Sequence, residues 1–131
     1  MKIYISIIVF FSFVIPKASA QEAKIISASE MITLQQQEPQ LQILDVRTLP
    51  ELEGGIIKDA INIDFFKEDF SEKVLKLDPK LPIVVYCASG RRSAKAAQFL
   101  KQNGYIKVFD LKGGFNEWKN SGNPVNFLKK K

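Results

Sequence analysis

The sequence contains no histidine and only one cysteine, Cys87, among its 131 residues. Without histidine, neither a Cys–His nor a Ser–His catalytic pair can form, and metal ligation by imidazole is excluded. A single cysteine cannot form an internal disulfide, although small exported domains are often stabilised by paired cysteines. Chemistry at Cys87 therefore has to activate the thiolate without a histidine base, and the alternative is an inert, buried thiol. We expect no metal and no organic cofactor.

Long hydrophobic runs are also scarce, and the one present is at the N-terminus. Lys2 precedes the apolar segment 3–15 (IYISIIVFFSFVI), and the small residues 18–20 (ASA) precede Gln21. This order is typical of a secretory signal peptide. The run is shorter than the roughly 20 residues that a membrane-spanning helix needs. We expect cleavage of residues 1–20, with no stable membrane insertion afterwards; the alternative is a retained anchor.

The predicted mature protein is a single domain of residues 21–131. It would be periplasmic in a Gram-negative host and otherwise secreted. Cleavage removes Lys2 and Lys17 and no acidic residue, which lowers the net charge from +5 to +3. The three lysines at 129–131 account for this excess, so the domain of about 24–126 is nearly neutral and carries a lysine-rich tail. We expect no binding of nucleic acid, which would require a basic patch on the folded domain.

Strand-like and helix-like segments alternate along the mature chain. Ser27 and Glu30 match a capping box that opens a helix to about Gln37. Further helices are expected at 69–77, 93–103 and 115–120, and strands at 41–46, 60–63, 83–86 and 107–111. This alternation predicts an α/β fold in which helices cover both faces of a small parallel β-sheet. Ligands in such sheets bind at the carboxyl ends of strands, and Cys87 directly follows the strand at 83–86.

The segment 87–93 (CASGRRS) has the composition of an anion-binding loop. Gly90 permits a tight turn whose backbone N–H groups approach the sulfur. The helix expected from Ser93 adds the positive end of its dipole, and Arg91 and Arg92 add full charges. These features predict a Cys87 pKa below the usual value of about 8.5 and a nucleophilic thiolate near neutral pH.

This loop resembles the active-site loop of rhodanese-like sulfurtransferases, whose pattern is roughly C-x-x-G-x-R-S/A. Three other segments resemble motifs of the same family. Residues 44–48 (LDVRT) resemble L-D-V-R-[ST], and residues 51–63 (ELEGGIIKDAINI) resemble E-[FY]-x-x-G-H-I-x-G-A-x-N-I. Residues 111–118 (LKGGFNEW) match L-x-G-G-x-x-x-W. The motifs occur in the order of the family and span about residues 24–126, nearly all of the mature chain.

The resemblance implies a rhodanese-like fold and a sulfurtransferase with Cys87 as the nucleophile. The enzyme would move a sulfane sulfur from an anionic donor such as thiosulfate, through a persulfide on Cys87, to a thiol, cyanide or a protein acceptor. It also implies a cradle for the donor and the persulfide, made by Ala88, Ser89, Gly90, Arg91, Arg92 and Ser93. Asp45 and Arg47 are expected to form a structural ion pair near the site, and Trp118 to fill the core.

Three positions depart from the family's pattern: Ile56 replaces a histidine, Asp59 a glycine, and Ala88 an arginine that several relatives carry. Altered packing and weaker capture of small anions are the expected consequences. The main alternative function is a non-enzymatic sulfur carrier or interaction module. A cysteine phosphatase or arsenate reductase would need arginine six positions after the cysteine, where this chain has Ser93. A thiol–disulfide oxidoreductase lacks its second cysteine.

Overall fold

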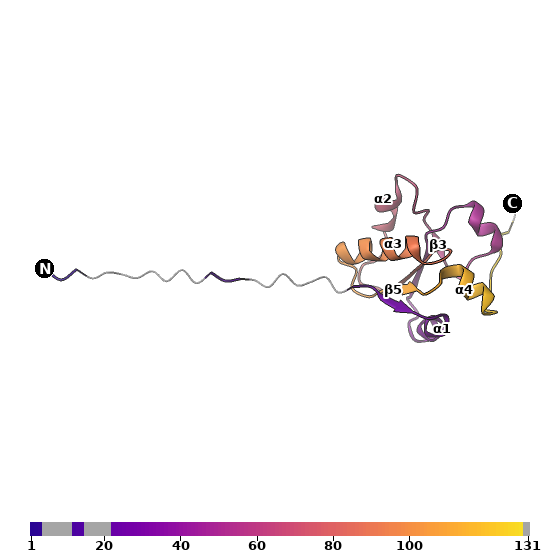
Figure 1. Cartoon of the computed structure of the whole chain (residues 1–131), viewed down its shortest axis with the longest axis horizontal. Coiled ribbons are helices and arrows are strands. Elements are labelled where there is room, and N and C mark those ends of the chain that lie inside the picture. Colours follow the sequence, from indigo (N-terminus) through magenta and orange to yellow (C-terminus); the bar gives the residue numbers. More distant parts are fainter. Residues whose placement is uncertain (4–11, 15–21, 130–131) are drawn as a thin grey trace.

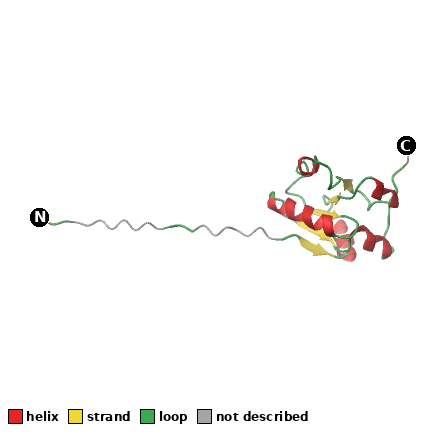
Figure 2. Ribbon diagram, turned by 45° about the horizontal axis from the view of Figure 1, so that its top comes forward, coloured by secondary structure: helices red, strands yellow, loops and turns green. Residues whose placement is uncertain are grey.

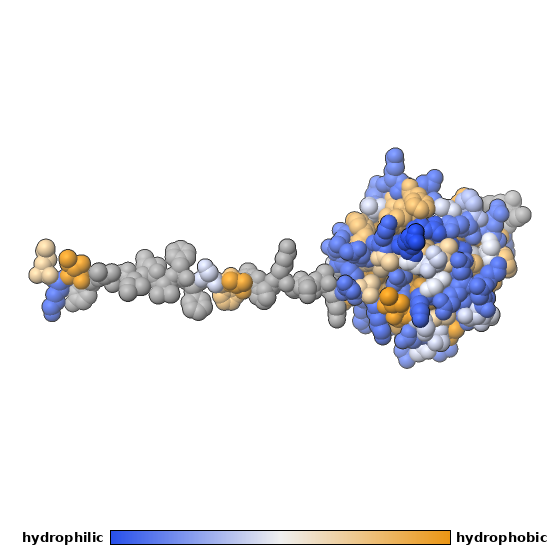
Figure 3. All heavy atoms as spheres, in the orientation of Figure 1, coloured by the Kyte–Doolittle hydropathy of each residue, from blue (hydrophilic) through white to orange (hydrophobic). Residues whose placement is uncertain are grey.

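The computed structural model describes residues 1–3, 12–14 and 22–129. Most of the predicted signal peptide, and its cleavage site, lie outside the described residues. In the described part of the chain, no helix is long and apolar enough to cross a membrane. On the face of the domain seen in Figure 3, hydrophilic residues separate the hydrophobic ones.

Five parallel strands form one sheet in the order β1-β5-β4-β2-β3. Figure 2 shows the strands together, with helices around them. Every strand pair in the sheet is parallel. The sheet confirms the predicted α/β class and its parallel strands. The strands are β1 (Lys24–Ile26), β2 (Gln42–Asp45), β3 (Ile61–Asn62), β4 (Ile83–Tyr86) and β5 (Val108–Leu111).

Helices cover both faces of this sheet, as predicted (Figure 1). One face packs against α2 and α3, and the other against α1 and α4. A short 3-10 helix, η1, follows β2. The bounds are α1 (Ala28–Gln37), η1 (Pro50–Gly54), α2 (Phe70–Val74), α3 (Arg91–Gln102) and α4 (Gly114–Asn120).

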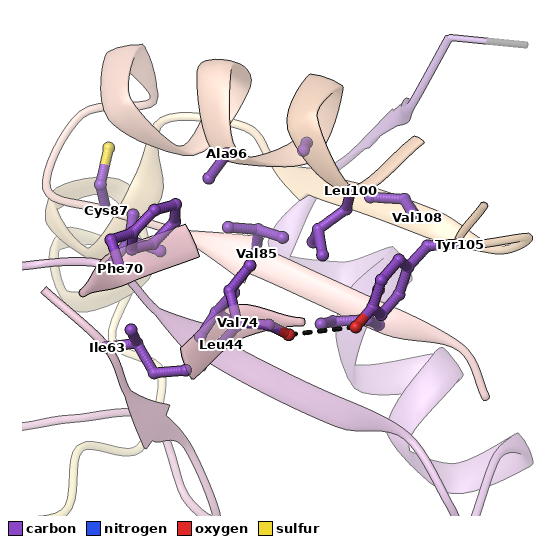
Figure 4. Close-up of a cluster of buried hydrophobic side chains, with 13 residues drawn as sticks. Leu44, Ile63, Phe70, Val74, Val85, Cys87, Ala96, Leu100, Tyr105 and Val108 are labelled. Atoms are coloured by element: carbon purple, nitrogen blue, oxygen red, sulfur yellow. Dashed lines mark hydrogen bonds between the residues drawn. The ribbon is translucent and has the colours of Figure 1, made fainter. Parts of the chain in front are cut away.

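The core between the sheet and α3 extends along the helix (Figure 4). Val85 of the central strand packs there with Ala96 and Leu100 of α3. At the far end, the Tyr105 hydroxyl donates to the carbonyl oxygens of Val74 and Leu77, at 3.0 and 2.7 Å. Cys87 lies at the opposite end of the cluster, where α3 begins (Figure 4). The thiol of Cys87 is therefore continuous with one end of the core.

The second core lies on the other face and includes Trp118, which is buried as expected. Its indole N–H donates to the carbonyl oxygen of Pro124 at 2.8 Å, which satisfies the polar end of a buried ring. Met31 of α1 and Phe115 of α4 belong to the same cluster. This packing fixes α4 on the sheet, close to the end of β4.

The predicted elements and the observed ones differ mainly at their ends. The capping box of Ser27 and Glu30 is present, and α1 ends at Gln37 as expected. Helix α3 begins at Arg91, two residues earlier than predicted, so both arginines of the loop lie in its first turn. Helix α2 ends at Val74 rather than at residue 77. Strand β1 and η1 were not anticipated.

Candidate active site

Cys87 follows the last residue of β4, at the edge where all five parallel strands end. Its side chain is 1% exposed. The backbone N–H of Gly90 donates to the Cys87 Sγ at 3.1 Å. Gly90 has a φ of 110°, a conformation that residues with a β-carbon rarely adopt, and it caps the N-terminus of α3. The glycine therefore turns the chain tightly enough for its own N–H group to reach the sulfur.

Hydrogen bonds at the sulfur outweigh the effect of its burial. Burial raises the pKa of the Cys87 thiol. The backbone and hydroxyl of Ser93, followed by the backbone N–H groups of Gly90 and Ser89, lower the pKa by stabilising the thiolate. The net result is a pKa below the usual value, which is the predicted direction. The chief cause is these hydrogen bonds rather than the charges of the two arginines.

Ser93 connects the loop to the first turn of α3. It is buried, and its hydroxyl donates to the carbonyl oxygen of Gly90 at 3.1 Å. The Cys87 thiol in turn donates to Ser93 Oγ at 3.6 Å. Ser93 thus holds the turn closed, and its Oγ accepts the hydrogen bond of the thiol.

The other predicted cradle residues differ in their exposure. Ala88 is half-buried, whereas Ser89 and Arg91 are exposed. The carbonyl oxygen of Ala88 accepts a hydrogen bond from the Asn116 N–H at 3.0 Å. Segment 87–93 therefore gathers around the sulfur mainly through its backbone, with Ser93 as the buried polar side chain. Their roles in binding a donor stay predictions.

Arg92 makes a two-pronged ion pair with Glu51, at 2.8 and 2.7 Å. These hydrogen bonds hold the pKa of Glu51 down, at about 2. They also raise the pKa of Arg92, to which Cys87 contributes less. The guanidinium carbon lies 5.5 Å from the centre of the Phe66 ring. The carboxylate of Glu51 thus balances the charge of Arg92, one of the two arginines expected to bind the donor.

Glu51 was not anticipated as a residue of the site. It comes from η1 and is 41 positions away from its partner in sequence. Its carboxylate also accepts the backbone N–H and the hydroxyl of Thr48, each at 2.8 Å. Its position at the start of the 51–63 motif was the signal that could have identified it.

Asp45 and Arg47 form a buried ion pair at the end of β2. Arg47 Nη2 lies 2.7 Å from Asp45 Oδ2, and both side chains are almost fully buried. Arg47 Nη2 also donates to the carbonyl oxygen of Gly55 at 2.8 Å. The guanidinium carbon lies 4.0 Å from the centre of the Phe115 ring. The ion pair is as the sequence suggested, and these contacts favour the structural role predicted for it.

Helix α4 supports the loop from the other side. The backbone N–H of Phe115 donates to the Cys87 carbonyl oxygen at 2.8 Å. A β-carbon at Gly114, whose φ is 58°, would lie 2.5 Å from that oxygen and 2.7 Å from the Ala88 oxygen. The second glycine of the 111–118 motif is therefore needed because the helix touches the backbone of the loop.

Two of the departures from the family's pattern lie outside the 87–93 loop. The backbone of Ile56 pairs with that of Asn126, at 2.7 and 2.9 Å. Asp59 has a φ of 65°, a conformation in which glycine is the least strained residue. It precedes β3, the edge strand two positions from β4, whereas Cys87 follows the end of β4. The turn that contains Asp59 does not face Cys87.

Among residues 1–3, 12–14 and 22–129, no group of three or more acidic or cysteine side chains could hold a metal ion.

Comparison with known proteins agrees with this architecture. The rhodanese-like domain family matches residues 27–121. The chain belongs to the rhodanese-like family. It is 39% identical over 77 residues to the uncharacterised protein YqhL of Bacillus subtilis, a match that covers 59% of this chain and 60% of that protein. It is 32% identical over 83 residues to a sulfurtransferase of Allochromatium vinosum, covering 63% of this chain and 76% of the relative.

A solved structure shares the fold over the same region. The rhodanese-related protein of Thermoplasma volcanium has a TM-score of 0.69 and 34% identity. The match covers 78% of this chain and 96% of that one. The rhodanese-like fold is thus confirmed, and a family relative is named as a sulfurtransferase.

Proposed function

We propose that the protein is a sulfurtransferase that carries sulfane sulfur as a persulfide on Cys87. The observation that supports this most strongly is the Gly90 N–H at 3.1 Å from Cys87 Sγ, in a loop whose hydrogen bonds lower the pKa of the thiol. A thiolate held by N–H donors at the start of a helix is nucleophilic without a histidine base.

The reaction has two steps that conserve charge and electrons. The Cys87 thiolate attacks the outer sulfur of thiosulfate, a new S–S bond forms, and sulfite leaves with the electron pair of the old S–S bond. The outer sulfur of the persulfide anion is then attacked by cyanide or a thiolate, which restores the Cys87 thiolate. With cyanide the product is thiocyanate. The N–H donors of the loop and the Ser93 hydroxyl stabilise the negative sulfur in both steps.

Steady-state thiocyanate release from thiosulfate and cyanide tests this proposal. We expect many turnovers per molecule with the wild-type protein and background release with Cys87→Ser. Serine is nearly isosteric with cysteine but cannot form a persulfide, which makes the variant a matched control. Release that is equal in both proteins would contradict the proposal.

The second candidate is a sulfur carrier that exchanges sulfur with a specific protein partner. The ion pair of Arg92 with Glu51 favours it, since the carboxylate offsets one of the two positive charges of the loop. Ala88 carries no charge at the position where several relatives carry arginine. A carrier would accept one sulfur per molecule but would not turn over with thiosulfate and cyanide. The ratio of thiocyanate to protein distinguishes the two functions.

We also propose that the protein is exported and that residues 1–20 are removed. The support is the order of charged, apolar and small residues in the sequence. Expression of the full chain, followed by intact mass of the protein from the extracytoplasmic fraction, tests export. A mature protein that begins at Gln21 is expected, and an uncleaved chain in the cytoplasm or the membrane would contradict it.

A further inference from the structure

Asp110 is a buried acid that the proposed chemistry does not use. It is 8% exposed, and its Oδ1 atom has no hydrogen-bond partner among the residues that the structure describes. Side chains alternate along a strand, so Asp110 of β5 shares a face of the sheet with Val108, which packs in the core beneath α3. A buried carboxyl oxygen without a partner is costly, so packing alone does not account for this residue.

A cavity of about 370 Å³ lies beside this acid. Asp110 lines it together with Ile25, its partner in the register between β5 and β1. Strand β1 is at the edge of the sheet, and Ile25 is 64% exposed. Binding sites for small molecules have volumes of about 300–1,000 Å³. The cavity is therefore large enough for a small organic ligand and not only for a single water molecule.

Helix α3 forms one wall of the cavity. Residues 94, 97, 98 and 101 line it, and spacings of three and four residues place them on one side of the helix. Ala94 and Ala97 make part of this wall apolar, as Ile25 does on the sheet. An elongated apolar group can thus lie between α3 and β1, with the Asp110 carboxyl beside it.

Negative charge exceeds positive charge among the described residues that line the cavity. Asp110 and Glu22, which lies ahead of β1, carry carboxyl groups, whereas Lys101 carries an ammonium group. The Lys101 ammonium already donates to the carbonyl oxygen of Ile106 at 3.0 Å. A ligand that brings its own positive charge and its own N–H donors therefore complements this cavity best.

We propose that the cavity binds a small organic ammonium ion. The N–H groups of the ligand donate to the Asp110 carboxylate, which gains the hydrogen-bond partner that it lacks. The alkyl chain of the ligand lies against Ile25, Ala94 and Ala97. The positive charge keeps Asp110 ionised, because a nearby opposite charge favours the charged form. This site is separate from the 87–93 loop, so the inference goes beyond the proposed sulfur transfer.

The test is a titration of the full chain with pentylamine at pH 7, followed by NMR. Pentylamine is an ammonium ion at this pH, as a lysine side chain is. We expect saturable shifts at the backbone amides of Ile25, Ala97 and Asp110. Absence of saturable shifts would overturn the proposal and leave a cavity that holds only water.

Two probes of the same chain length separate the charge of the ligand from its N–H donors. 1-Pentanol has no charge, and pentyltrimethylammonium has the charge but no N–H group. Each should bind about tenfold more weakly than pentylamine, because a charge-assisted hydrogen bond to the carboxylate is lost. Equal affinities for the three probes would contradict the role of Asp110 and overturn the proposal.

Asp110→Asn tests the acid directly, because it keeps the shape of the side chain and removes its charge. The affinity for pentylamine should fall by about tenfold. Asp59→Asn is the matched control: it removes one negative charge at an exposed residue that does not line the cavity. It should leave the affinity unchanged. Equal losses in both variants would mean that pentylamine responds only to the overall charge of the domain, and would overturn the proposal.

Ala94→Phe tests the cavity without altering the acid. Ala94 is exposed on α3, and a phenylalanine side chain there would occupy the space of the ligand. Binding of pentylamine should be lost, and unchanged binding would contradict the proposal even if Asp110→Asn does not fold. The titration requires neither a sulfur donor nor thiocyanate release, so its outcome does not depend on the sulfurtransferase proposal.

Discussion

The Asp45–Arg47 and Glu51–Arg92 pairs have the same chemistry but different surroundings. The first is almost fully buried and joins β2, the Gly55 carbonyl oxygen and the Phe115 ring. The second is partly exposed and joins η1 to the first turn of α3. Breaking a buried ion pair is costly, whereas a partly exposed one contributes little to stability. We therefore expect the first pair to matter mainly for stability, and the second mainly for the charge near Cys87.

The largest effect is expected from removing the buried arginine. Arg47→Met keeps an apolar stem but leaves the Asp45 carboxylate buried without its partner. The expected loss in the free energy of unfolding is about 3–5 kcal/mol, measured by urea denaturation at pH 7. Arg92→Met is the matched variant in the second pair, with an expected loss below about 1 kcal/mol. Equal losses in the free energy of unfolding would contradict the expectation that the buried pair contributes more to stability than the partly exposed one.

The contact between α4 and the loop is linked to the buried pair, because the Phe115 ring of α4 packs against Arg47. Gly114→Ala places a β-carbon against the Cys87 and Ala88 carbonyl oxygens, and strains a φ of 58°. We expect a loss of more than about 1 kcal/mol in the free energy of unfolding, together with slower thiocyanate release.

Gly122→Ala is the control for the backbone strain alone. Gly122 has a φ of 77°, but a β-carbon there meets nothing within 4 Å. The expected loss is about 1–2 kcal/mol from the left-handed conformation, with unchanged thiocyanate release per folded molecule. If both variants lose the same stability and neither changes the rate, α4 does not position the loop.

Ser93→Ala tests the stabilisation of the sulfur itself. The variant removes one hydrogen bond to the thiolate, so the pKa of Cys87 should rise by about one pH unit. Since iodoacetamide reacts with the thiolate, the alkylation curve should shift to higher pH by the same amount. Arg91→Ala should leave the curve nearly unchanged, because exposed charges are strongly screened by salt. A larger shift for Arg91→Ala would give the arginines the role that the sequence first suggested.

The smallest effect on stability is expected at the exposed pair. Glu51→Gln frees Arg92 and should change the free energy of unfolding by less than about 1 kcal/mol. It should lower the KM for thiosulfate by about two- to fivefold, because more positive charge faces the dianion. An unchanged or higher KM would show that Glu51 does not limit the use of Arg92 by the donor.

The pH dependence of this pair follows from the pKa of Glu51. Because that pKa is lowered to about 2, the carboxylate stabilises the folded state above its unfolded value of about 4.3, and this contribution is lost as pH falls toward 2. The difference in stability between the wild type and Glu51→Gln should therefore shrink between pH 4 and pH 2. A difference that is constant over this range would contradict the ion pair.

Local patterns in the sequence were sufficient to predict most of the fold. The β-branched run at Ile83–Tyr86 and the capping box at Ser27 were sufficient to predict a strand and a helix start. Strand β1 has three residues, two of them exposed, and so lacks the apolar pattern that identifies a buried strand. Helix α3 starts at Arg91 because Gly90 caps it, and a glycine cap leaves a weaker signal than Ser93 did.

Only part of the candidate site could be predicted from local sequence patterns. The position of Cys87 and the N–H groups of its loop could be predicted, because β4, Gly90 and α3 follow one another along the chain. Glu51 could not, because its partner Arg92 is distant in sequence. Pairing of Arg92 with a carboxylate 41 residues away depends on how η1 packs beside α3, which no local pattern encodes.

The most direct test of the account is the intact mass of the wild-type protein before and after thiosulfate, and again after cyanide. The account predicts a gain of one sulfur atom that cyanide removes, and no gain in Cys87→Ser. If the wild type gains no sulfur while iodoacetamide still alkylates Cys87, thiosulfate is not a donor. If Cys87→Ser gains the sulfur as well, Cys87 does not carry it, and the central claim is wrong.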